Sequence, residues 1–167
     1  MAGALIVTAE IAPLDFSWID GLRRAHYPPE RNRVPAHLTM FHALPPSAET
    51  ELRSRLGKIV RQPVPEATIA GVMDLGGGVA FRIVSPGLDR IRDELAEELH
   101  GLLGAQDSGG WRPHITIQNK VTPKIARALK ESLERAFRPR PLAIGGLAVW
   151  RYLDGSWERV AAYPFRA

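Results

Sequence analysis

Apolar residues recur along this chain with two periods, alternating in some segments and spaced by three or four in others. Alternation is typical of a strand with one buried face, and the longer spacing is typical of a helix with one buried stripe. The pattern predicts strands at 4–9, 37–40, 67–72, 114–117 and 142–147, and helices at 16–26, 52–59, 85–102 and 125–137. Glycine-containing turns at 76–78 and 154–156 lead into two further strands. We therefore expect an α+β fold with mostly antiparallel sheets.

The third predicted helix has the clearest start signal in the chain. Ser85 suits the N-cap, and Pro86 suits the first helical position. Leucine and isoleucine then follow at steps of three and four up to Leu102, and Gly104 marks the end. The polar stretch 107–110 is typical of a loop that leads to the strand at 114.

The second half of the chain repeats the order of elements in the first. In each half, a strand is followed by an amphipathic helix, a basic link that contains proline, a second strand, a turn and a third strand. This duplication predicts one domain, residues 1–167, with two pseudo-symmetric lobes. If a pseudo-two-fold axis relates the two lobes, we expect the first strands of the two halves to face each other across a central cleft.

Both of these first strands carry the same tetrapeptide pattern. The chain reads His-Leu-Thr-Met at 37–40 and His-Ile-Thr-Ile at 114–117, which is 114 − 37 = 77 residues later. Alternation along a strand places the aliphatic residues in the core and projects His and Thr together from the opposite face. An imidazole and a hydroxyl side by side, supplied twice, suit proton transfer around a phosphate group.

Neighbouring residues add candidate contacts to a substrate. Phe41 and Gln118 share the parity of the motif histidines, which predicts that they line the cleft, Phe41 by stacking on a base or by packing at the lobe junction. Lys120 continues the same face toward a phosphate, and Tyr27 and Trp111 flank the motifs as base platforms. His42 has the opposite parity, so we expect it to face the core.

Composition and charge favour an intracellular protein that meets anionic ligands. The chain has a hydrophobic fraction of 45%, a net charge of +4 and no Cys, which rules out disulfides and Cys-ligated zinc. Its opening apolar run is too short to span a bilayer and lacks a charged leader, so we expect a cytoplasmic protein that does not bind membranes. Arginine suits phosphate oxygens, and arginines near the motifs include Arg23, Arg24, Arg31, Arg33 and Arg112.

Other kinds of chemistry fit the sequence less well. Two imidazoles without a nearby carboxylate or thiolate form a poor metal site, so we expect neither a metal nor another cofactor. The glycines at 76–78 lack the Gly-Lys-Ser/Thr ending of a phosphate-binding loop, and the chain has no Gly-x-Ser-x-Gly element of a serine hydrolase.

The paired motifs resemble those of the 2H (two-histidine) phosphoesterase superfamily, whose members include bacterial 2′-5′ RNA ligase-like proteins and RNA cyclic phosphodiesterases. Pro35 and Pro113 stand just before the motifs, as proline often does in that family. The resemblance implies two lobes whose antiparallel sheets form a concave cleft, with helices on the outside. The duplicated order of elements extends the resemblance over nearly the whole chain. Only the eight residues of the two motifs are specific to the family.

The resemblance also implies an activity. The protein would be a metal-independent phosphodiesterase acting on 2′,3′-cyclic phosphate ends of RNA or nucleotides, and we expect a monomer with no obligate protein partner. His37 and His114 would serve as general acid and base, and Thr39 and Thr116 would bind the phosphate. The sequence does not assign acid and base between the two histidines. It also leaves open a 2′-5′ RNA ligase that joins ends through the same site, and a non-catalytic module that binds nucleotides or RNA.

Overall fold

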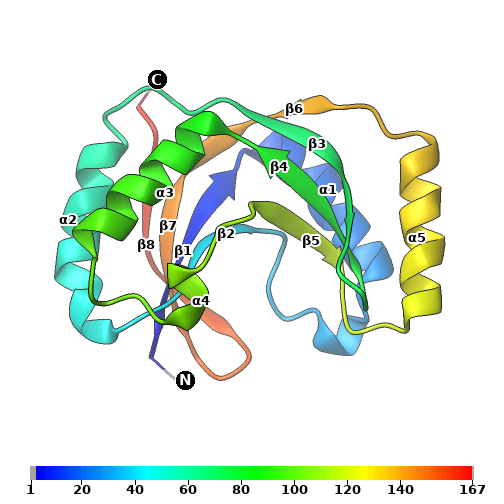
Figure 1. Cartoon of the computed structure of the whole chain (residues 1–167), viewed down its shortest axis with the longest axis horizontal. Coiled ribbons are helices and arrows are strands. Elements are labelled where there is room, and N and C mark those ends of the chain that lie inside the picture. Colours follow the sequence, from blue (N-terminus) through cyan, green and yellow to red (C-terminus); the bar gives the residue numbers. More distant parts are fainter. Residues whose placement is uncertain (1–2, 167) are drawn as a thin grey trace.

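The computed structural model describes residues 3–166 and contains two four-stranded antiparallel sheets (Figure 1). The first sheet has the order β2-β1-β7-β8, formed by Leu38–Leu44, Leu5–Ile11, Ile144–Tyr152 and Trp157–Pro164. The second has the order β5-β4-β3-β6, formed by His114–Gln118, Val79–Val84, Ala67–Asp74 and Arg140–Leu142. The predicted α+β fold with antiparallel sheets is confirmed. Met1 and Ala2, where we looked for a charged leader, and Ala167 lie outside the described residues.

The longer helices lie on the outside of the two sheets. In Figure 1, α1 and α5 stand at one side of the molecule, and α2 and α3 stand at the other. The helices are α1 (Pro13–His26), α2 (Glu49–Ile59), α3 (Pro86–Glu98), the short α4 (Ala105–Ser108) and α5 (Pro123–Arg135), with 3-10 turns at Pro29–Arg31 and Pro46–Ala48. In residues 3–166, no helix combines the length and the apolar content that crossing a bilayer requires.

The duplication is visible in the order of elements, and the two halves exchange strands. The order β1, α1, β2 repeats as β4, α3, β5. In each repeat the motif strand pairs with the first strand, so β2 pairs with β1 and β5 pairs with β4. From the first half, α2 leads to β3, which pairs with β4. From the second half, α5 leads through β6 to β7, which pairs with β1. Neither sheet is therefore built from one half of the chain alone, which the sequence pattern did not predict.

A single hydrophobic core connects both sheets. The four aliphatic residues of the motifs, Leu38, Met40, Ile115 and Ile117, are fully buried in it, as the alternation predicts. Thr39 and Thr116 lie between them and are only half-buried. Burial of the aliphatic face therefore fixes which face of each motif strand turns toward solvent.

Three predicted element boundaries are wrong. The helix that starts after Ser85 ends at Glu98 and not near Leu102, because the chain turns at Gly101, whose φ of +88° suits glycine. α4 occupies part of the predicted loop at 107–110. The predicted strand at 142–147 is divided between β6 and β7, which lie in different sheets. The N-cap at Ser85 is confirmed, because its side-chain oxygen accepts a hydrogen bond from the N–H of Leu88 at 3.1 Å.

Candidate active site

The two motif histidines have the same local geometry. His37 lies directly before β2, and its Nδ1 lies 2.8 Å from the carbonyl oxygen of Pro35. His114 is the first residue of β5, and its Nδ1 lies 2.7 Å from the carbonyl oxygen of Arg112. A carbonyl oxygen can only accept, so Nδ1 carries the hydrogen in both rings. In the neutral ring, Nε2 is then the nitrogen whose lone pair can take up a proton.

His37 is held in its neutral form by its surroundings. The Trp157 ring, from β8, lies 4.7 Å from the imidazole of His37 between ring centroids. Burial lowers the pKa of His37 from 6.5 to about 4, and the positive charges of Arg23, His114 and His42 lower it further, against the opposing effect of the hydrogen bond to Pro35. At neutral pH, His37 is therefore almost entirely unprotonated.

Arg23 connects α1 to the strand of the second motif. It was expected to attract a phosphate, but it is buried, with an exposed fraction of 4%. Its Nη1 donates to the carbonyl oxygen of Thr116 at 2.9 Å, and its Nε donates to Oδ1 of Asn32 at 2.8 Å. Burial lowers the pKa of this guanidinium from its usual value. Arg23 therefore supports β5, and its guanidinium also covers one face of the Tyr27 ring at 4.3 Å from the ring centroid.

Two hollows open beside the motifs. One, of about 390 Å³, is lined by Thr39 of the first motif together with His114 of the second. The other, of about 510 Å³, is lined by His37 and by residues of β1, β7 and β8. β2 and β5 also contact each other. The structure thus brings residues from both motifs to one surface, although they are far apart in the sequence.

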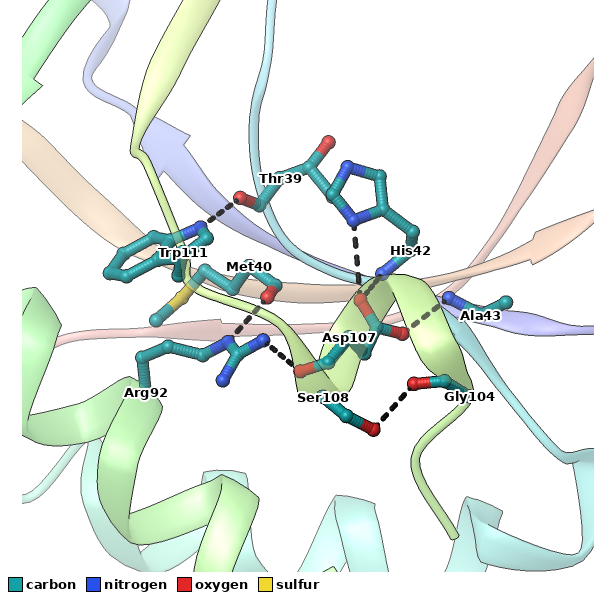
Figure 2. Close-up of polar contacts among 9 residues, drawn as sticks. All are labelled: Thr39, Met40, His42, Ala43, Arg92, Gly104, Asp107, Ser108 and Trp111. Atoms are coloured by element: carbon teal, nitrogen blue, oxygen red, sulfur yellow. Dashed lines mark hydrogen bonds and ion pairs between the residues drawn. The ribbon is translucent and has the colours of Figure 1, made fainter.

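Trp111 joins the loop before β5 to the first motif. Its Nε1 donates to the carbonyl oxygen of Thr39 at 3.0 Å (Figure 2). The ring also lines the hollow that contains Thr39 and His114. Its predicted role as a base platform, like that of Tyr27, stays a prediction. Lys120 is exposed but lies beyond the end of β5 with a φ of +64°, so it does not continue the face of the strand as predicted.

Phe41 and Gln118 do not line the cleft, contrary to prediction. Their exposed fractions are 0% and 3%. The physical reason is a register shift in each motif strand, between the pairs Val7/Phe41 and Thr8/Thr39 in the first sheet and between Val79/Gln118 and Ala80/Thr116 in the second. Such an irregularity inserts an extra residue and reverses the alternation beyond it. The Phe41 ring is instead covered by the guanidinium of Arg92, 4.1 Å from the ring centroid.

The same irregularity turns His42 outward, so the prediction that it faces the core is wrong. His42 lines the hollow that contains Thr39 and His114. Its Nδ1 lies 3.2 Å from Oδ1 of Asp107, and its backbone N–H donates to the same oxygen at 2.7 Å (Figure 2). The other oxygen of Asp107 accepts from the N–H of Ala43 at 2.9 Å. No local signal pointed to this pairing, because Asp107 lies in what the sequence suggests is an ordinary loop.

The carboxyl group of Asp107 stays ionised despite its burial. Burial by itself acts to raise the pKa of Asp107, but the hydrogen bonds from the ring and backbone of His42 and from the backbone of Ala43 outweigh it, so the pKa lies below its usual value. An ionised carboxylate only accepts hydrogen bonds. Nδ1 of His42 therefore donates to Asp107.

Removing the Trp157 ring is expected to raise the pKa of His37 from about 4 toward 6.5, because burial is the largest cause of the lowering. Trp157→Ala admits water to the imidazole, whereas Trp157→Leu keeps an apolar side chain over it. The pKa of His37 in both variants can be read from an NMR titration of the ring protons. A value that stays near 4 in Trp157→Ala contradicts this account of the lowering.

Comparisons with known proteins agree with this architecture. The family model of the 2′-5′ RNA ligase superfamily matches residues 11–156, which include both motifs. Similar solved structures are TT0787 of Thermus thermophilus (TM-score 0.65, 16% identity, 98% of each chain covered) and LigT of E. coli complexed with 3′-AMP (TM-score 0.64, 17% identity, 100% of each chain covered). No curated protein matches the sequence. The structures show a shared fold, and the family model, which spans most of the sequence, shows that the chain belongs to the 2′-5′ RNA ligase superfamily.

Proposed function

We propose that this protein is a metal-independent phosphodiesterase that opens 2′,3′-cyclic phosphate ends of RNA or nucleotides. The observation that carries the proposal is the matched geometry of the two motif histidines. Both donate Nδ1–H to the backbone carbonyl two residues earlier, at 2.8 and 2.7 Å. Both therefore leave Nε2 for proton exchange, which is what a reaction with one proton removed and one delivered requires.

His37 serves as the general base and His114 as the general acid. A pKa of about 4 keeps His37 unprotonated at neutral pH, so its Nε2 can accept a proton from water as the water oxygen attacks phosphorus. The bond from phosphorus to one ribose oxygen then breaks, and His114 delivers a proton from Nε2 to that oxygen. The product is a phosphate monoester. Before the next turnover, His37 gives its extra proton to solvent and His114 takes one up.

Thr39 and Thr116 bind the phosphate. Each lies between two buried aliphatic residues on its strand and is half-buried itself. We assign their hydroxyl groups as donors to the non-bridging oxygens, whose negative charge grows in the transition state. Donors held in place in this way stabilise that charge without reorganisation during the reaction.

The relatives favour a nucleotide as ligand. LigT of E. coli has been solved in complexes with 3′-AMP, NADP+ and ATP, at 17–20% identity to this chain. By analogy we infer that this protein accepts small nucleotides or the ends of RNA. The absence of Cys is compatible with the reducing cytoplasm, where we place it as a monomer.

End joining is the second candidate function, and the family name favours it. The same two histidines can open the ring with a 5′-hydroxyl in the place of water. The new bond from phosphorus to the 5′-oxygen then replaces the bond to the ribose 3′-oxygen, and the product is a 2′-5′ phosphodiester. Incubation with RNA that ends in a cyclic phosphate, with and without a 5′-hydroxyl acceptor, distinguishes the candidates. Hydrolysis in both samples supports the phosphodiesterase, and joined product with acceptor supports the ligase. Binding without product supports a non-catalytic module and overturns both.

The acid limb of the pH profile is expected near pH 4. The base form of His37 is lost as the pH falls through the pKa of His37, about 4, so kcat/KM for a 2′,3′-cyclic nucleotide should hold down to about pH 5 and then drop. Circular dichroism at each pH serves as the control for folding. An acid limb near 6.5 in a folded protein contradicts the assignment of His37 as the base.

A further inference from the structure

The hollow that contains Thr39 and His114 also holds two groups that the proposed reaction does not use. These are the imidazole of His42, from β2, and the side chain of Arg112, from the loop before β5. The hollow, of about 390 Å³, leaves room beyond the reacting phosphate for a further part of a substrate.

His42 is oriented by a buried carboxylate. The His42 side chain is 38% exposed, whereas that of Asp107 is 1% exposed. Because Nδ1 donates to Asp107, the other ring nitrogen points away from that carboxylate, as Figure 2 shows. Such a carboxylate fixes the tautomer and the direction of an imidazole and balances its charge when it becomes an imidazolium.

Asp107 is itself held by Arg92. The Nη2 of Arg92 donates to the carbonyl oxygen of Asp107 at 2.7 Å, and its Nε donates to the carbonyl oxygen of Met40 at 2.8 Å. Arg92 is buried, so its guanidinium adds a fixed positive charge at the wall of the hollow. These contacts connect α3, α4 and β2. They hold Asp107 in place, and Asp107 in turn holds the ring of His42 in one direction.

The groups that line the hollow favour an anion. Arg112 is exposed, and a guanidinium matches phosphate oxygens with paired hydrogen bonds. Asp74 brings a negative charge to the lining of the hollow. Its Oδ1 accepts a hydrogen bond from the N–H of Gly76 at 2.7 Å. Asp107 lies behind His42 and does not line the hollow, so the lining itself carries the two cations of Arg92 and Arg112 against the one carboxylate of Asp74.

His42 lies outside the two motifs that the proposed reaction uses. It follows Thr39 on β2 on the other side of the register shift, and its Nδ1 is turned to Asp107 of α4. The proposed reaction assigns Thr39 to the reacting phosphate and leaves the exposed edge of the His42 ring without a role. A second anion at this edge would fill that role.

We propose that His42 and Arg112 bind a second phosphate group of the substrate. This inference rests on the proposed function and narrows its substrate class to RNA ends or nucleotides that carry a further phosphate beside the reacting one. Nε2 of His42 shares a proton with the second phosphate while Asp107 accepts Nδ1–H, and the guanidinium of Arg112 supplies the paired contact.

Two ligands that differ by one phosphate test the inference. We expect adenosine 3′,5′-bisphosphate to bind at least about tenfold more tightly than 3′-AMP, the usual gain from a hydrogen bond to a charged group. Isothermal titration calorimetry gives both values of Kd. In His42→Gln and in Arg112→Gln, this advantage should fall below about threefold. His100→Gln and Arg127→Gln, which change exposed side chains outside the hollow, should keep it.

The outcomes separate this inference from the proposed function. Equal affinity of the unmodified protein for the two ligands overturns the second-phosphate site, while hydrolysis of a 2′,3′-cyclic nucleotide by the same sample leaves the proposed function in place. An advantage that persists in both folded variants also overturns it. If neither ligand binds and no cyclic phosphate is opened, the inference and the proposed function fail together.

Discussion

Replacing either His37 or His114 with alanine is expected to reduce kcat/KM for a 2′,3′-cyclic nucleotide by about 10²–10⁴-fold, the usual contribution of a positioned acid or base. Each ring has its Nδ1 engaged by a backbone carbonyl, so each has one nitrogen for the reaction. No other group takes part in either proton transfer of the proposed reaction. The double variant should therefore be little worse than either single one, because the two rings act as a unit.

The controls for this prediction come from histidines outside the site. His26→Ala and His100→Ala change exposed side chains at the ends of α1 and α3, and both should keep the rate of the unmodified protein. EDTA should have no effect on the reaction. A His37→Ala variant with a near-normal rate contradicts the two-histidine mechanism, and so does a rate that EDTA abolishes.

The two motifs are alike in sequence and backbone but differ in surroundings. Both histidines bond to the carbonyl two residues before them, yet only His37 has an indole ring at 4.7 Å. That ring comes from β8, a strand of the second half that lies in the same sheet as the first motif. The exchange of strands between the halves thus gives two copies of one motif different environments, and different environments suit opposite roles in proton transfer.

Local patterns predicted the parts of the site that depend on local structure. Alternation placed Leu38, Met40, Ile115 and Ile117 in the core, because the burial of an aliphatic side chain decides the face of a strand. The motif itself identified the two histidines and threonines. These predictions needed only the residues of one strand.

The parts that failed depend on contacts between distant segments. The register shift in β2 arises from its pairing with β1, and it reversed the faces assigned to Phe41 and His42. The bond from His42 to Asp107 spans 65 residues, and the contact of His37 with Trp157 depends on how β8 joins the first sheet. The spacing of apolar residues along the chain does not show how strands pair or which distant residues meet.

Asp107→Ala is expected to destabilise the fold by about 3–5 kcal/mol, because it removes one partner of a buried network. The carboxylate accepts from the N–H of His42, the N–H of Ala43 and the ring of His42. Without it, the N–H groups of His42 and Ala43, on a half-buried part of β2, lose their acceptor, and α4 loses these hydrogen bonds to that strand. The free energy of unfolding can be measured by urea titration followed by circular dichroism.

Ser108→Ala is the matched control for this loss. Ser108 is the neighbour of Asp107 in α4 and is exposed, and its hydroxyl donates only to the nearby carbonyl oxygens of Gly104 and Leu103. Removing it should therefore change stability by at most about 0.5 kcal/mol. The difference between the two variants should also shrink in acid. The pKa of Asp107 is lowered by folding, so its contribution is present above the unfolded pKa of 3.8 and is lost as the pH falls through the folded value. A loss below about 1 kcal/mol for Asp107→Ala at neutral pH would show that the carboxylate does not hold α4 against β2, and the orientation of His42 would then need another cause.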